Sequence, residues 1–313
     1  MAQLVKLQNY ISRYEMDLTH YPTQFIRLKR TQWERVKKQW LIGKVPVEWE
    51  HHKEKNEPKQ PNFLHKLFRK KQDQTIESIE DEKEELLQTE NEEMSLHFEP
   101  NIIYQPESID ELKRLFLDQL FHFQLKWASS TLLSKSLIDP KFYRDGFLRT
   151  MLQRLPDHYL LFYYPIMKVK NTTVELDVIL ITPTDCLCIT IVEEEESAVY
   201  IGSGERFWIK KIGDSERKVL NPLIQLNRME AILSEIFKQN DVNMPIRKIL
   251  LSRTCYFDYP NPPYNVQLID RWEYSSWIEN LRQSTSPMKK VQVQCVQAIL
   301  RNVETVSISR DYR

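Results

Sequence analysis

Hydrophobic side chains near the N-terminus recur at helical spacing. Within residues 3–18 the apolar positions lie three and four residues apart, which is typical of one face of an amphipathic helix; they are Leu4, Leu7, Ile11, Tyr14 and Leu18. Tyr21-Pro22-Thr23 interrupts this pattern, and a second helical pattern with a basic flank follows. Together they predict an N-terminal helical hairpin over residues 1–42, whose apolar stripe could seat a partner helix.

Residues 43–104 lack such a pattern. They contain the basic run HKLFRKKQ and then the acidic run IESIEDEKEELLQTENEE, which predicts a charged, flexible linker. The pair His51-His52 lies there without further ligands at useful spacing, so no metal site is expected from it. Ser108-Ile-Asp-Glu111 then has the spacing of a capping box and predicts a long helix leading into the core over residues 105–140.

From Tyr159 onward the hydrophobic pattern becomes that of strands. VELDVILIT and CLCITIVE are successive apolar strands joined by the turn Pro183-Thr184-Asp185, and a hairpin bearing Trp208 follows. A helix to about Lys238, two more strands and two more helices complete the pattern. This order predicts an α+β (α/β) fold with a mixed central β-sheet flanked by helices, its core over residues 141–255 and completed by residues 256–313.

Composition narrows the class of protein. Among the 313 residues, 44 Lys and Arg balance 44 Asp and Glu, which argues against coating of nucleic acid by bulk charge but allows a local basic patch. Five glycines exclude a Gly-rich phosphate loop. The four cysteines lack paired metal-ligand spacing and predict buried free thiols. No signal core or membrane-length apolar run is present, so we expect a cytoplasmic protein without a membrane partner.

Residues 140–255 resemble the nuclease-related domain, called NERD. The resemblance rests on the Asp-bearing strand followed by a second apolar strand, on Trp208, and on Asn221-Pro222-Leu-Ile-Gln225 at the start of a helix. That family belongs to the PD-(D/E)xK restriction-endonuclease-like group. The resemblance implies a restriction-endonuclease-like core and a divalent metal held by an acid on the first helix, an Asp on one strand and a Glu-x-Lys on the next.

Only part of that metal-binding motif is present. Asp177 matches the strand Asp, but Thr190 and Val192 stand at the positions of the Glu and the Lys. On the helix, Gly146 is followed by Phe147 instead of an acid. We therefore expect a degenerate catalytic site, no hydrolytic activity and no cofactor.

An alternative is a metal-dependent DNA nuclease whose site has moved. Glu175 and Glu194 would then join Asp177 to hold Mg²⁺ or Mn²⁺. A step of two residues moves a carboxylate by about 6.6 Å along a strand, which is more than a coordination shell tolerates. A third interpretation is structural, with Asp177 paired to Arg228 or Lys168.

For function, the leading hypothesis is a degenerate domain that binds nucleic acid, with DNA as the expected partner, or that binds a protein. The candidate phosphate contacts are Gln225, Arg228, Arg206, Lys210 and Lys211, with Arg217 and Lys218 beside them. Trp208, Asn221 and Pro222 are assigned structural roles, because Asn221 can cap the helix that Pro222 begins. A further alternative is a structural or regulatory interaction protein that binds a partner through residues 1–41.

Overall fold

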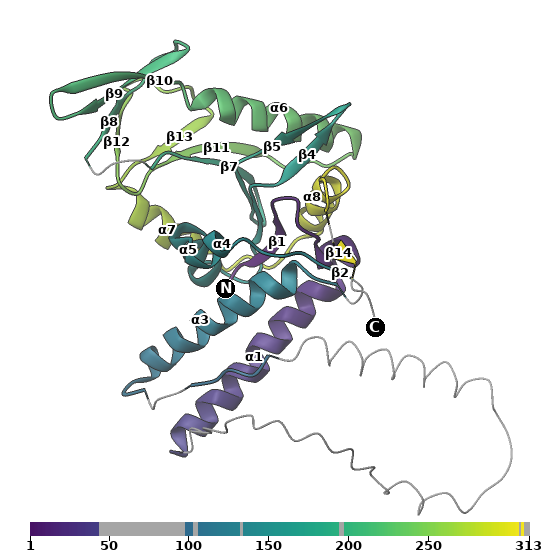
Figure 1. The fold of residues 1–313 in the computed structure, drawn as a ribbon. Helices are drawn as coiled ribbons and strands as arrows, with labels where there is room; N and C mark the ends of the chain where they lie inside the picture. The colour runs from purple at the N-terminus through teal and green to yellow at the C-terminus, as the bar shows by residue number, and fades with distance from the viewer. Residues whose placement is uncertain (44–97, 103–105, 132–133, 194–196, 307, 310–313) are drawn as a thin grey trace, which may run out of the picture.

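The computed structural model describes the whole chain except residues 44–97, 103–105, 132–133, 194–196, 307 and 310–313. Its centre is a six-stranded sheet (Figure 1), whose strands in spatial order are β1 (Gln3–Leu7), β3 (Leu160–Tyr163), β6 (Val178–Ile181), β7 (Cys186–Ile191), β11 (Ile246–Leu251) and β13 (Val266–Ile269). β1 runs parallel to β3, and β7, β11 and β13 run parallel to one another. β6 is antiparallel to both of its neighbours. The sheet is therefore mixed, as predicted.

A second sheet stands beside the first. In spatial order it contains β10 (Ser215–Leu220), β9 (Phe207–Ile212), β8 (Val199–Ile201) and β12 (Tyr256–Asp258). Two short pairs complete the strands: β4 (Ile166–Val169) with β5 (Thr172–Glu175), and β14 (Ile308–Ser309) with β2 (Ser134–Lys135). The β9–β10 hairpin projects from the rest of the molecule (Figure 1).

Helices cover both faces of the central sheet (Figure 1). α6 (Leu223–Gln239) and α8 (Lys290–Leu300) lie on one face, and α3 (Ile109–Ala128) and α5 (Gly146–Arg154) on the other. α1 (His20–Leu41) packs along α3, and α4 (Pro140–Arg144), α7 (Tyr274–Arg282) and the 3-10 turn η1 (Arg13–Glu15) are shorter. This arrangement confirms the predicted α+β class. None of the helices that the structure describes combines the length and apolar content needed to cross a membrane.

Burial on both faces explains the continuous apolar strands. Every residue of β3 and β6 is buried, and so are the first five of β7. Strands covered by helices on both sides need no alternation of polar and apolar residues. All four cysteines are free and buried, as predicted.

The N-terminal helical hairpin is a wrong prediction. Gln3–Leu7 forms the edge strand β1, which pairs with β3, and helix begins only at His20. Leu4 and Val5 are adjacent and both are 0% exposed, which requires a strand covered on its two faces. Pairing with the sheet edge outweighs the helical spacing of so short a segment. Because Leu4, Leu7, Tyr14 and Leu18 are all buried, the stripe offers no seam to a partner.

Other element boundaries also differ from the prediction. The segment between the long helix and the first strand of the core contains two short helices, α4 and α5, because Asp145 ends the first and caps the second. The long helix predicted over residues 105–140 is shorter and ends at Ala128. β10 was not predicted as a strand. Most of the expected linker 43–104, with the pair His51-His52, lies outside the described residues.

Gly202 lies close to the Tyr259 side chain, and a substitution there tests the packing of the second sheet. A Cβ at this position would lie 2.7–2.8 Å from Tyr259 side-chain atoms, and the Tyr259 ring packs edge-on against Trp208. We expect Gly202→Ala to lower the free energy of unfolding by about 1–3 kcal/mol, because the half-buried Tyr259 ring must shift. Gly204→Ala is the control, since nothing lies within 4 Å of its Cβ position. Equal urea midpoints for the two variants would contradict this contact.

Candidate functional site

Asp177 occupies the break between two strands. VELDVILIT does not form one strand: β5 ends at Glu175, β6 begins at Val178, and Asp177 lies in the connection between them. The half-buried carboxylate accepts a hydrogen bond from Thr190 Oγ1 at 2.6 Å and a longer one from Gln225 Nε2 at 3.4 Å. Neither Arg228 nor Lys168 pairs with it, so the interpretation of Asp177 as an ion-pair partner is wrong. Three elements, the β5–β6 connection, β7 and α6, therefore meet at this carboxylate.

The environment of Asp177 shifts the pKa of its carboxyl upward. Burial raises the pKa of this carboxyl, and the hydrogen bonds from Thr190 and Gln225 oppose that rise without cancelling it. A site that binds Mg²⁺ places several ionised carboxylates together and gives their charge to the metal. At Asp177 the neighbouring groups are a hydroxyl and an amide, which donate hydrogen bonds to one carboxylate instead.

Thr190 and Val192 lie at the end of β7. Thr190 is buried, and its hydroxyl points to Asp177 and also lies 4.0 Å from Met229 Sδ of α6. Val192 follows the strand and carries no charge. A Glu at position 190 would place a second carboxylate against Asp177, and like charges at that distance disfavour ionisation of both unless a cation lies between them. The threonine hydroxyl fills this position without needing a cation.

Asp145, which was not among the predicted site residues, is the acid nearest to the expected helix position. It precedes Gly146, whereas the resemblance implies an acid after the glycine, where Phe147 stands. Its Oδ1 accepts hydrogen bonds from the Phe147 and Leu148 amides, each at 2.9 Å, and its Oδ2 accepts one from the Tyr163 hydroxyl at 2.5 Å. Both oxygens are thus occupied in capping α5 and in holding Tyr163. An Asp before an apolar run was the available signal for such a cap.

Tyr164 lies among several acids. Burial raises the pKa of Tyr164 to about 12, with further contributions from the charges of Asp177, Asp145, Glu175 and Glu193. Its backbone has φ of +51°, a left-handed conformation that is uncommon outside glycine and clusters at functional sites. One of these acids is already neutralised, because Glu193 forms a two-bond ion pair with Arg253.

Among the residues that the structure describes, the carboxylates of the predicted relocated metal site do not come together. Glu175 is exposed at the end of β5, and Glu194 lies outside the described residues. In the part of the chain that the structure describes, no group of three or more His, Cys, Asp or Glu side chains is arranged to hold a metal ion.

The predicted phosphate-contacting residues are divided between two places. Gln225 and the exposed Arg228 lie in the first turns of α6, and Gln225 contacts Asp177. Arg206 and Lys211 are exposed on the β9–β10 hairpin, where Lys211 pairs with Glu216 at 3.7 Å. Lys210, in contrast, is 7% exposed, so its prediction as a surface phosphate contact is wrong. The alternation of β9 turns Lys210 to the buried side.

Trp208, Asn221 and Pro222 join the hairpin to α6. Trp208 is 1% exposed and donates from Nε1 to the Ser203 carbonyl at 2.8 Å. Asn221 Nδ2 donates to the Glu205 carbonyl at 2.8 Å, and its Oδ1 accepts from the Leu223 amide at 2.9 Å. Asn221 thus ties the first amide of α6 to the preceding loop. These bonds set the direction in which α6 leaves the sheet and so place Gln225 beside Asp177.

Comparison with known families now places this arrangement. Residues 145–252, from Asp145 through Asp177 and α6 to the end of β11, match the family model of the nuclease-related domain. The chain carries a nuclease-related domain. Among curated proteins, an RNA 2',3'-cyclic phosphodiesterase of Geobacillus stearothermophilus is 60% identical over 40 residues, which is 13% of this chain and 13% of that protein. The similarity is confined to that short segment of both proteins. No solved structure matches the chain.

Proposed function

We propose that the nuclease-related domain of this chain binds nucleic acid without hydrolysing it. The observation that carries the proposal is the 2.6 Å hydrogen bond from Thr190 Oγ1 to Asp177 Oδ2. Thr190 stands at the position where the resemblance implies a metal-binding Glu. Its uncharged hydroxyl donates a hydrogen bond to Asp177 instead. Val192 supplies no ammonium group to orient an attacking water. Two of the other carboxylates nearby have structural partners, since Asp145 caps α5 and Glu193 pairs with Arg253.

The surface beside Asp177 supports the binding part of the proposal. Arg228 is exposed on α6 near Gln225, and Arg206, Arg217 and Lys218 are exposed on or next to the hairpin that leads into α6. Exposed Arg and Lys side chains contact phosphates through charge, in a way that depends on salt. Because the chain as a whole has no net charge, we expect it to bind nucleic acid through the few phosphate contacts that this local patch can make.

A cleavage assay tests the catalytic part. We expect that linear, circular and single-stranded DNA stay intact with the wild-type protein in Mg²⁺ or Mn²⁺, and also with Asp177→Ala purified identically. Cleavage by the wild type that is lost in Asp177→Ala would contradict the proposal and establish a metal-dependent nuclease. Cleavage by both proteins to the same extent would indicate a contaminating nuclease, and the assay would be repeated after further purification has removed it.

A salt titration tests the binding part. Fluorescence anisotropy of a labelled DNA should show affinity that falls as salt rises, and Arg228→Gln should weaken binding and reduce the salt slope by about 1. Lys238→Gln is the matched control, because Lys238 is an exposed cation in the last turn of the same helix. Absent or salt-insensitive binding would leave a protein as the partner of this domain. An equal loss in both variants would remove Arg228 from the interface.

A further inference from the structure

A basic cavity lies on the opposite side of the fold from α6. It has a volume of about 950 Å³ and is bounded by α1, α3, the end of α5 with the loop after it, and the segment after α7. This volume is at the upper end of the range for small-molecule sites. The cavity shares no residue with the Asp177 site. Segments from both ends of the chain and from its middle form the walls, so folding creates the cavity.

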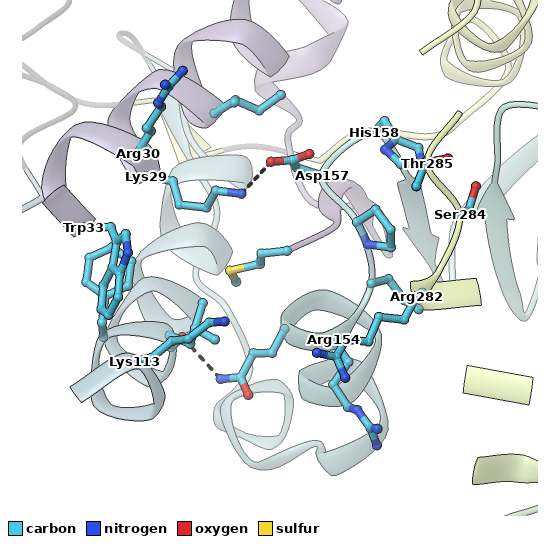
Figure 2. A pocket seen from close by; sticks show the side chains of 17 residues that line it. Lys29, Arg30, Trp33, Lys113, Arg154, Asp157, His158, Arg282, Ser284 and Thr285 are labelled. Atoms are coloured by element: carbon cyan, nitrogen blue, oxygen red, sulfur yellow. Dashed lines mark hydrogen bonds and ion pairs between the residues drawn. The ribbon is translucent and has the colours of Figure 1, made fainter. Parts of the chain in front are cut away.

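Positive charge dominates the walls. Five cations line the cavity against one carboxylate, Asp157; the cations are Lys29, Arg30, Lys113, Arg154 and Arg282. The labelled basic side chains stand on several sides of the opening (Figure 2). Cations that surround one space, instead of following a stripe, suit a compact polyanion better than an extended polymer.

Only part of this charge is neutralised. Lys29 Nζ lies 2.6 Å from Asp157 Oδ2. Burial alone would raise the pKa of Asp157, but the hydrogen bond and charge of Lys29 outweigh burial and lower it, so this pair is ionised. Arg282 reaches Glu279 at 3.3 Å, but both side chains are more than 40% exposed and such pairs are weak. Arg30, Lys113 and Arg154 form no ion pair with any carboxylate that the structure describes.

The cavity also has an apolar side and an unused polar atom. Ile26, Trp33 and Phe116 line it, and the Trp33 and Phe116 rings lie 5.4 Å apart. His158 also lines it, and its buried Nε2 has no hydrogen-bond partner among the described residues. Burial lowers the pKa of His158, so the ring is neutral near neutral pH and adds a hydrogen-bonding group without adding charge. A buried polar atom without a partner calls for an explanation, and at a cavity wall a bound water, ion or ligand can supply it.

We propose that this cavity binds an organic polyphosphate with a ring, that is, a nucleotide of the nucleoside triphosphate class. The unpaired cations Arg30, Lys113 and Arg154 hold the phosphates, and the wall of Ile26, Trp33 and Phe116 takes the ring. This proposal goes beyond nucleic-acid binding at α6 and does not depend on it, since the two sites have no residue in common.

Calorimetry with ATP in the absence of divalent metal tests the proposal, using the full chain. We expect binding by the wild type and a roughly 10- to 100-fold higher Kd for Arg30→Gln/Lys113→Gln, because two charged hydrogen-bond donors are lost. The matched control is Arg27→Gln/Arg114→Gln. It removes two exposed cations from the same helices, α1 and α3, and neither lines the cavity. The control should bind ATP as the wild type does.

Two further titrations test the phosphates and the ring of the ligand one at a time. Inorganic tripolyphosphate should bind more weakly than ATP, and adenosine should not bind measurably. No binding of ATP, or an equal loss in the cavity variant and its control, would overturn the site. Tripolyphosphate binding as tightly as ATP would overturn recognition of the ring. A single-stranded oligonucleotide that requires Arg30 and Lys113 while ATP does not bind would also overturn the proposal, because the occupant would be a polymer.

Discussion

Leu4→Ala is expected to lower the free energy of unfolding by about 2–5 kcal/mol. Leu4 is 0% exposed in β1, and β1 is covered by α3 and paired with β3. Truncation there removes buried methyl groups and leaves a cavity that the edge of a six-stranded sheet cannot easily close. An N-terminal helix separate from the core would predict almost no effect.

Met16→Ala is the matched control for that experiment. Met16 lies in the same N-terminal segment and is 70% exposed, so its truncation should change stability by less than about 0.5 kcal/mol. Urea unfolding should give a lower midpoint for Leu4→Ala at an unchanged slope, and a midpoint near the wild type for Met16→Ala. If the two variants behave alike, residues 3–7 do not belong to the central sheet.

The second large effect concerns a buried lysine on β11. Lys248 is 4% exposed, and its Nζ lies 2.6 Å from Glu230 Oε2 and 2.8 Å from Asn227 Oδ1, both on α6. Glu230→Gln leaves a buried ammonium group without a charged partner. We expect this substitution to cost about 3 kcal/mol, at the lower end for a broken buried pair. The Glu230 side chain itself keeps 31% exposure, so water can solvate its carboxylate.

This asymmetry makes the test selective. Lys248→Met leaves only the partly solvated Glu230 unpaired, and should therefore cost less than about 1 kcal/mol. The double variant Lys248→Met/Glu230→Gln should recover most of the loss seen in Glu230→Gln alone, giving a clear interaction energy in a double-mutant cycle. Thermal or urea unfolding of the four proteins measures it. Equal costs for the two single variants would mean that the pair is solvated on both sides.

The central strands of the sheet were predictable because helices cover both of their faces. CLCITI and VILI are continuous apolar runs bounded by turn residues, and such runs are strands whether or not their neighbours are known. The helix after Asn221-Pro222 was equally clear from its cap and its apolar spacing. β1 was not predictable in this way. Its short pattern fits a helix as well as a strand, and only the free edge of β3 decides between them.

The candidate site, like the fold, was predictable only in part. Residue types and the resemblance predict that Asp177 retains the acid of the motif, and that Thr190 and Val192 replace its carboxylate and ammonium groups. The spacing of residues along one strand does not show which side chains of neighbouring elements they contact. The tertiary structure decided that Thr190 and Gln225 are the partners of Asp177, since the β5–β6 connection, β7 and α6 converge there.

The sequence by itself determined the fold class, the central strands and the buried thiols, because each depends on local patterning or on residue type. The tertiary structure alone decided the edge strand β1, the contact of Asp145 with Tyr163 and the basic cavity. Each of these depends on contacts between segments far apart in the chain: β1 with β3, α5 with Tyr163, and α1 with α3 and the segment after α7. Such contacts are made by the packing of elements and leave no periodic signal in the chain.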